Sequence, residues 1–126
     1  MVTLVTVDVR ERRSNVPALL EELGATVEMR RLDAGDYVCG PQTVVERKTV
    51  RDLHLTIIGG RLWRQLGALR NSARWPCLMV EGRDLFRGRI DADAIRGTCL
   101  AATDLGIVVD NQNRGRAGRI RHSGGS

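Results

Sequence analysis

Hydrophobic and polar residues follow one another along this chain in patterns that predict both strands and helices. Residues 3–9 are rich in β-branched side chains, which favours a buried strand, and residues 25–32 alternate as a second strand does. Leucines at helical spacing predict a helix over 61–73. Shorter segments complete the prediction, with strands at 75–82 and 106–109 and a helix at 91–105.

Capping residues predict a further helix directly after the first strand. Ser14 or Asn15 would cap its N-terminus with Pro17 in the first turn, and Gly24 would end it. Three leucines give this helix its predicted apolar face: Leu19, Leu20 and Leu23.

Turn residues predict a hairpin over 35–48, with Gly40-Pro41 at its tip. Thr49 follows as the expected cap of a helix that carries three apolar residues, Val50, Leu53 and Leu55. The resulting order is β-α-β-β-β-α-α-β-α-β. Strands and helices in this order predict an α/β fold, a mixed central sheet with helices packed on both faces.

Composition agrees with one soluble globular domain of 126 residues, because 42% of the residues are hydrophobic and 28% are charged. No apolar run is long enough to span a membrane, and the N-terminus lacks a secretory signal pattern. The three cysteines are far apart, which argues against a zinc site or a disulfide framework. We therefore expect a cytoplasmic protein, associated with the nucleoid if its source is bacterial.

The net charge of +5 is concentrated near the C-terminus. Residues 111–126 carry four of the 20 basic residues and none of the 15 acids, which leaves residues 1–110 with 16 basic and 15 acidic residues. We predict a domain over 1–110 and a disordered Gly/Arg/Ser tail over 111–126. The tail would either add salt-dependent affinity for nucleic acid or only aid solubility.

Lys48 is the only lysine, whereas the other 19 basic residues are arginines. An ammonium is a compact charge that can lose its proton when desolvated, but a guanidinium stays charged and planar. A lone lysine in so arginine-rich a chain therefore favours a chemical role at position 48.

The predicted hairpin brings acids to this lysine. A turn at Gly40-Pro41 places residues 35–37 across from 44–46, so that Asp36 comes close to Glu46. Strand alternation points Glu46 and Lys48 to one face and Arg47 to the other. Two further acids, Asp8 and Asp52, would reach the same region.

Two close carboxylates repel unless a positive charge lies between them, and Mg²⁺ prefers hard oxygen ligands. Such a cluster beside an ammonium suits attack on a phosphodiester. The alternative is that Glu46 and Lys48 form an ordinary ion pair on the surface of an α/β binding domain.

Several motifs resemble those of one known family. "GDY" at 35–37 with "ERKTVRD" at 46–52 resembles the G-D-x(n)-E-R-K-x-x-x-D signature of the XPF/Mus81 (ERCC4-domain) nucleases. "VDVRE" at 7–11, "IIGGRLWRQLGALR" at 57–70 and "PCLMVEG" at 76–82 resemble further segments in the family's order. The resemblance implies a restriction-endonuclease-like fold.

The resemblance also implies a role for each matching residue. Asp36, Glu46 and Asp52 would bind Mg²⁺ or Mn²⁺, and Lys48 would act as catalytic base or charge stabiliser. Asp8 and Arg10, with Glu11, would lie at the edge of this catalytic site.

Three further residues match family positions at or beside the site, and the resemblance implies that they would contact DNA: Arg61, Gln65 and Arg47. Helix packing would equally explain Arg61 and Gln65. Arg47 faces away on the predicted strand, so we also expect a structural ion pair there, with Asp8 or Glu11.

The family implies a metal-dependent, structure-specific endonuclease that cleaves branched or flapped DNA in repair or recombination. The alternative is a non-catalytic DNA-binding or partner subunit on the same fold. The family acid before G-R-L is Gly59 here, and the chain has no helix-hairpin-helix motif. A homodimer, or a helicase or helix-hairpin-helix partner, would supply what this chain lacks.

Overall fold

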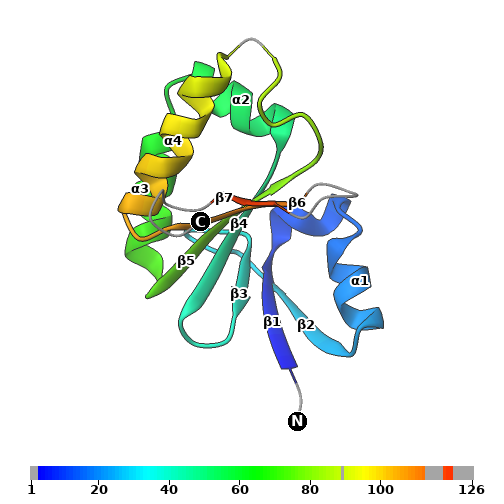
Figure 1. The fold of residues 1–126 in the computed structure, drawn as a ribbon. Coiled ribbons are helices and arrows are strands. Elements are labelled where there is room, and N and C mark those ends of the chain that lie inside the picture. The colour runs from blue at the N-terminus through cyan, green and yellow to red at the C-terminus, as the bar shows by residue number, and fades with distance from the viewer. Residues whose placement is uncertain (1–2, 89, 113–117, 121–126) are drawn as a thin grey trace.

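A seven-stranded mixed sheet forms the centre of the molecule, a computed structural model that describes residues 3–88, 90–112 and 118–120 (Figure 1). The strands are β1 (Thr3–Asp8), β2 (Ala25–Arg30), β3 (Tyr37–Cys39), β4 (Thr43–Thr49), β5 (Trp75–Glu81), β6 (Val108–Gln112) and β7 (Gly118–Ile120). Their order across the sheet is β2-β1-β3-β4-β5-β6-β7. The pairs β1–β2, β4–β5 and β5–β6 are parallel, and the other neighbours are antiparallel.

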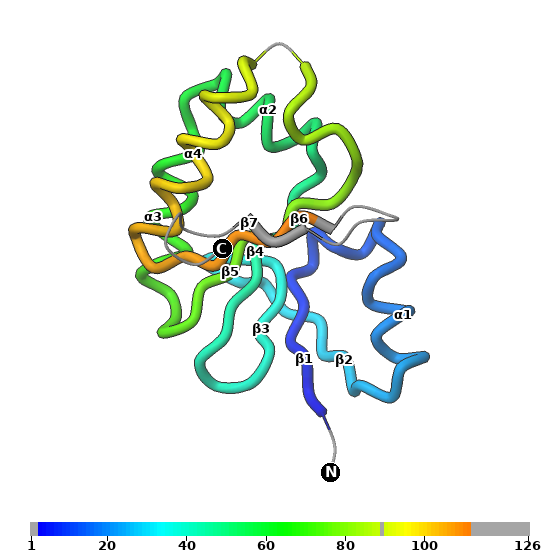
Figure 2. Tube along the Cα trace, in the orientation of Figure 1, coloured from blue at the N-terminus to red at the C-terminus, as the bar shows by residue number. Residues whose placement is uncertain are grey.

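Helices cover both faces of this sheet, as the sequence predicts. They are α1 (Val16–Glu22), α2 (Val50–Ile58), α3 (Leu62–Ser72) and α4 (Ala92–Asp104), with a short 3₁₀ helix η1 (Val9–Arg13). Figure 1 shows α1 on the side opposite to α2, α3 and α4. The Cα trace in Figure 2 passes from β4 directly into α2, continues into α3 and returns through the sheet as β5. Within the described part of the chain, no helix has the length and apolar character needed to cross a membrane.

The hairpin of β3 and β4 forms as predicted, but its register is shifted by one residue, because three residues, 40–42, separate the strands instead of Gly40-Pro41 alone. Tyr37 pairs with Val45, and Gly40 adopts a φ of +78°, a conformation that glycine reaches without a steric penalty. Thr49 also caps α2 as expected, because its hydroxyl accepts a hydrogen bond from the Asp52 N–H at 3.1 Å.

Two apolar cores lie on the two faces of the sheet. The larger one packs under α2, α3 and α4 and includes fully buried residues from four elements, Leu53, Leu66, Val80 and Ile95. The smaller one lies under α1 and contains Val5, Val7 and Tyr37. The larger core anchors α2, the helix that follows the ERK motif.

The predicted apolar face of α1 is wrong for two of its three leucines. Leu19 is 45% exposed and Leu23 is 85% exposed, whereas Val16 and Leu20 pack against the smaller core. Residues four apart share one side of a helix, so Val16 and Leu20 form a different stripe from Leu19 and Leu23. A helix of seven residues can turn only one of these stripes toward the sheet.

The first strand ends at Asp8, and the structure adds η1, which the sequence pattern does not predict. Asp8 caps η1, because its Oδ2 accepts a hydrogen bond from the Arg10 N–H at 2.8 Å. The cap therefore stops β1 one residue earlier than predicted and turns the chain toward α1.

The C-terminal segment differs from the disordered tail that was predicted over 111–126. Strand β6 runs on to Gln112, and Asn111 is buried, with its amide donating to the Val80 carbonyl at 3.0 Å. Strand β7 pairs antiparallel with β6, so the prediction is wrong for 111, 112 and 118–120. The rest of the predicted tail, 113–117 and 121–126, lies outside the described residues.

Candidate active site

Acidic residues from three neighbouring strands meet at one edge of the sheet. The Asp8 N–H donates to the Asp36 carbonyl at 2.8 Å, and the Asp36 N–H donates to the Val45 carbonyl at 2.8 Å. The first bond extends the β1–β3 ladder by one step, and the second ties Asp36 to Val45, the residue of β4 that pairs with Tyr37. Asp36 therefore lies between the end of β1 and Glu46 on β4, as the hairpin predicts.

Asp8 is almost fully buried, and backbone and side-chain donors occupy both of its carboxylate oxygens. Oδ2 accepts from the Arg10 N–H at 2.8 Å and from Arg10 Nε at 2.6 Å, while Oδ1 accepts from the Leu32 N–H at 2.7 Å. Burial alone would raise the pKa of Asp8, but these hydrogen bonds outweigh it and lower the pKa to about 2. Asp8 is thus a permanently ionised residue that orients Arg10.

Arg10 places a positive charge at this edge. Its side chain is 67% exposed and is held by the hydrogen bond to Asp8. That bond is the main cause of its raised pKa, and the charges of Asp36 and Glu46 raise it further. Arg10 therefore faces the predicted acidic site and remains accessible to a ligand.

Asp36 and Glu46 form a pair of close carboxylates with unusual proton affinities. Burial raises the pKa of Asp36, although its Oδ2 accepts a hydrogen bond from the Arg47 N–H at 2.8 Å. Burial also raises the pKa of Glu46, and the charge of Asp36 adds to it, so that the value reaches about 7 despite Lys48. A buried and a partly buried acid side by side are a place where added positive charge is favourable.

Lys48 lies beside Glu46, as strand alternation predicts. Its Nζ is 3.8 Å from Glu46 Oε2, and the residue is only 9% exposed. Nζ also donates to Thr56 Oγ1 at 3.4 Å, while the Thr56 hydroxyl donates to the Asp52 carbonyl at 2.7 Å. Because its proton is used on that carbonyl, Thr56 presents its lone pairs to the ammonium.

Thr56 is a residue that the sequence reasoning missed. It is 5% exposed on α2, in an otherwise apolar stretch between Leu55 and Ile57. Its position four residues after Asp52 puts both on one side of the helix, and this spacing is the signal that would have found it.

Asp52 stands apart from the two other predicted metal ligands. It lies in the first turn of α2 with an exposed side chain, and its N–H is held by Thr49. Among the residues described, no three His, Cys, Asp or Glu side chains lie close enough to hold one metal ion. Asp36 and Glu46 therefore lie close to each other, but Asp52 does not join them. The metal-binding roles of all three stay predictions.

Arg47 points to the opposite face of β4, as predicted. Its Nε lies 3.4 Å from Glu11 Oε1, although not in hydrogen-bonding alignment, and two other contacts reach Glu81 at 3.6 Å and Ser14 Oγ at 3.1 Å. The Tyr37 hydroxyl donates to the same Glu11 oxygen at 2.5 Å. The expected ion pair with Glu11 is confirmed, and contact with DNA stays a prediction for this mostly buried guanidinium.

Arg61 and Gln65 lie at the start of α3. The Arg61 carbonyl accepts from the Gln65 N–H at 3.1 Å, and the buried Gln65 side-chain oxygen has no hydrogen-bond partner among the described residues. The exposed Arg61 side chain crosses Gly59, because a Cβ at position 59 would collide with the guanidinium. DNA contacts by Arg61 and Gln65 stay predictions.

The edge of β1, β3 and β4 thus combines a close carboxylate pair, a buried ammonium and an exposed guanidinium. The carboxylate pair supplies hard oxygen donors that suit a divalent ion, while the two cationic groups suit a phosphate. This combination can polarise and hold a phosphodiester.

Comparison with known proteins finds one family and several relatives whose names describe DNA repair endonucleases. A family model described as the ERCC4 domain matches residues 7–109. The 3′-flap repair endonuclease Xpf of Saccharolobus solfataricus is 42% identical over 82 residues, which are 65% of this chain and 35% of that protein. The DNA repair endonuclease XPF of Mus musculus is 40% identical over 77 residues, 61% of this chain and 8% of that protein.

A solved structure supports the fold. XPF from Aeropyrum pernix in complex with DNA matches with a TM-score of 0.80 at 36% identity, over 88% of this chain and 56% of that one. The likeness confirms the predicted mixed sheet flanked by helices. The chain spans no more than 35% of the length of the two curated relatives above.

Proposed function

This chain belongs to the ERCC4-domain family, and we propose that it is a divalent-metal-dependent endodeoxyribonuclease acting on branched or flapped DNA. The observation that carries the proposal is the grouping of Asp36, Glu46 and Lys48 at one edge of the sheet. These residues match the family motif, and their carboxylates and ammonium lie side by side. Such groups can bind a metal ion and stabilise charge during hydrolysis of a phosphodiester.

We propose that Asp36 and Glu46 hold the metal, Mg²⁺ or Mn²⁺. Burial raises the pKa of both carboxyl groups, and the charge of Asp36 raises the pKa of Glu46 further, so a divalent ion between them would be favourable. Mg²⁺ typically uses one or two protein carboxylates together with waters and phosphate oxygens, so two acids suffice. A bound ion would supply positive charge to the phosphate and activate water.

The side chains around this pair have separate tasks in the proposed reaction. Lys48 is held by Glu46 and Thr56 and would stabilise negative charge that develops on the phosphate. Glu46 has a pKa of about 7 without an ion, so it would give up its proton when the metal binds. Arg10, oriented by Asp8, would bind a phosphate oxygen.

Other predicted residues would act on the DNA around the cut. Asp52 would approach the site from the first turn of α2 once a ligand is bound, and Arg61 and Gln65 would contact the phosphate backbone. The name of one relative specifies a 3′ flap, so that DNA geometry is the first substrate to test.

The decisive experiment measures cleavage of 3′-flap, fork and linear duplex DNA side by side, with Mg²⁺, with Mn²⁺ and with a chelator. We expect metal-dependent cleavage of the flap or fork, and its loss in Lys48→Ala and in Asp36→Asn while both variants stay folded. Full activity in either folded variant would contradict the assigned site. An unfolded Lys48→Ala protein would instead indicate a structural ion pair.

Metal binding has a readout that does not depend on cleavage. A ligand that binds only the folded state raises its free energy of unfolding by mass action. Mg²⁺ should therefore stabilise the unsubstituted chain at pH 8, and less so after Asp36→Asn. Equal stabilisation of both proteins would place the ion elsewhere.

A non-catalytic DNA-binding or partner subunit is the alternative, and two observations favour it. Asp52 is exposed and separate from the carboxylate pair, and Gly59 stands where the family has an acid. Under this alternative the chain binds branched DNA but cleaves only with a helicase, a helix-hairpin-helix protein or a second copy. Cleavage by the chain alone would exclude it.

A further inference from the structure

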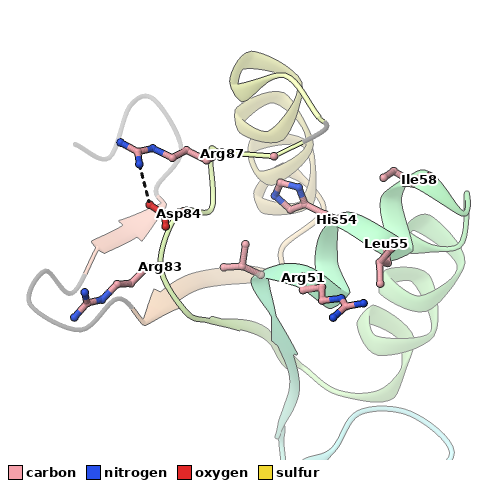
Figure 3. A pocket seen from close by; sticks show the side chains of 9 residues that line it. Arg51, His54, Leu55, Ile58, Arg83, Asp84 and Arg87 are labelled. Atoms are coloured by element: carbon pink, nitrogen blue, oxygen red, sulfur yellow. Dashed lines mark ion pairs between the residues drawn. The ribbon is translucent and has the colours of Figure 1, made fainter.

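A hollow of about 530 Å³ lies beside α2, away from the carboxylate pair. One wall is α2 and the other is the loop between β5 and α4 (Figure 3). Arg51, Leu55 and Ile58 line it from the helix, and Arg83 and Arg87 from the loop. No role in the reaction proposed above uses these residues.

The rim of the hollow is positively charged. Figure 3 shows Arg83 and Arg87 on the loop side and Arg51 on the helix side. All three are exposed, and the one acid of the lining, Asp84, lies 3.8 Å from Arg87. Three exposed guanidinium groups against one carboxylate favour an anionic ligand.

The helix wall is apolar. Leu55 is 47% exposed and Ile58 is 54% exposed, although both are large hydrophobic residues. An apolar surface bordered by arginines fits a ligand that is anionic on one side and flat and apolar on another. A nucleotide has this character, with a phosphate at one end and a base at the other.

His54 fixes the loop against α2, so the hollow is formed before a ligand arrives. Its Nε2 lies 2.8 Å from the Leu85 carbonyl, and the residue is only 8% exposed. Gly88 packs against the other ring nitrogen, where a Cβ would lie 2.9 Å from Nδ1, and its φ of +141° also favours glycine. A preformed site avoids the entropy cost of ordering a loop on binding.

The hollow and the candidate active site occupy adjacent stripes of the same helix. Asp52 and Thr56 follow one stripe of α2, and Thr56 holds Lys48. Arg51, Leu55 and Ile58 follow the next stripe. One nucleic acid strand crossing α2 would therefore meet both.

We propose that this hollow binds an unpaired nucleotide of the DNA strand near the cut, with its phosphate on the arginines and its base on Leu55 and Ile58. The inference rests on the proposed function, because it assigns a second contact to the same substrate. A base inside a duplex hides both faces by stacking, so the apolar wall selects single-stranded DNA. Such a contact gives the protein a means to distinguish flapped DNA from linear duplex DNA.

The test uses binding of a fluorescent twelve-residue oligothymidylate to Lys48→Ala protein without metal, followed by fluorescence anisotropy. One variant carries Arg51→Glu and Arg83→Glu. Its matched control carries Arg70→Glu and Arg74→Glu, two exposed arginines near the opposite end of β5, with the same change in charge. Circular dichroism verifies that both are folded.

We expect the hollow variant to bind about ten-fold more weakly than its parent, and the slope of log K against log salt to fall by about 1.4 for two lost phosphate contacts. The control should stay within about two-fold, since it removes no phosphate contact. Equal weakening in both variants would show that only net charge matters, and an unchanged affinity in the hollow variant would also overturn the inference.

A second comparison tests the base. Ile58→Ser should weaken binding of oligothymidylate several-fold but leave binding of an abasic oligonucleotide of equal length unchanged, with Leu23→Ser as the exposed control. Equal loss with both probes would overturn a base contact. Loss of binding to a decaglutamate peptide, with oligothymidylate unaffected, would identify an acidic peptide as the ligand and would overturn the proposal.

These binding measurements do not depend on cleavage. If the chain binds oligothymidylate as expected but never cuts DNA, the result supports the binding site in the hollow and contradicts the proposed nuclease activity. If the chain cuts flaps but both double variants bind oligothymidylate equally, the result supports the nuclease activity and contradicts the binding site in the hollow.

Discussion

The two faces of β4 carry charged residues from one short motif but balance their charges differently. On one face Arg47 contacts Glu11, Glu81 and Ser14, so a single cation has several partners. On the other face Lys48 has one close carboxylate, Glu46, whose pKa of about 7 reflects burial and the charge of Asp36.

This difference separates a structural role from a chemical one. Charges that are compensated by fixed partners stabilise the fold and have little left to offer a ligand. Charges left in mutual repulsion raise the free energy of the empty site, and a ligand that relieves it gains that energy. We therefore expect Arg47 to have a structural role and Lys48 a chemical one, since strand alternation sends these adjacent residues to opposite faces.

The largest expected effect comes from making the same substitution on each face. Lys48→Met should lower the cleavage rate by roughly 10²–10⁴-fold, the usual contribution of a positioned catalytic group, with little loss of stability. Arg47→Met should instead lower the free energy of unfolding by about 2–4 kcal/mol, because Glu11 loses its buried partner. Urea unfolding and single-turnover cleavage of both variants measure the contrast. The reverse pattern would contradict the assignment of the two faces.

The next effect concerns pH. The pKa of Glu46 is raised from 4.5 to about 7, so the folded state holds a proton that the unfolded state has released. Glu46 therefore makes the protein lose stability as the pH rises from about 4.5 to 7, by on the order of 1–3 kcal/mol. Glu46→Gln should remove this loss in urea unfolding at pH 5 and pH 8. Glu28→Gln, on the edge strand β2, is the control and should retain it.

A smaller effect is expected from the partner of the lysine. Thr56→Val keeps the shape of the side chain but removes the oxygen that holds Lys48 Nζ at 3.4 Å. Losing one such hydrogen bond should lower the cleavage rate by about ten-fold and shift its pH profile. Thr56→Ser should restore both, because it restores the hydroxyl. An unchanged pH profile in Thr56→Val would show that Thr56 only packs against its neighbours and does not act on Lys48.

The smallest effect is expected at Gly59. Its φ of −75° suits any residue, and a Cβ would meet the flexible end of Arg61 and, at 3.2 Å, the Leu55 carbonyl oxygen, which would have to shift by a few tenths of an ångström. Gly59→Asp should therefore change the free energy of unfolding by less than about 0.5 kcal/mol, as for a surface substitution. A larger loss in urea unfolding would mean that Arg61 is fixed in position.

Local signals made much of the fold predictable. Gly40-Pro41 gave the hairpin to within one residue of its register, and with it the approach of Asp36 to Glu46, because turn residues act over a few positions of chain. The Thr49 cap was predictable for the same reason. The family motifs extended the prediction to the outline of the whole domain.

Features that depend on distant partners were not predictable in this way. Spacing alone does not decide which stripe of α1 faces the sheet, and Leu19 and Leu23 prove to be exposed. The pairing of β7 with β6 depends on an edge that exists only after the sheet has formed. The exposure of Asp52 depends on how α2 is rotated about its axis, which the larger core fixes.

Glu46, Lys48 and Thr56 come from one continuous segment that contains the end of β4 and most of α2. Their spacing is thus set by neighbouring backbone, whereas Asp8 and Arg10 reach the site from a different strand. On warming, the β1 side should detach first, leaving the ammonium and its two partners as a persistent unit. Amide protons of β1 would then exchange with deuterium before those of β4.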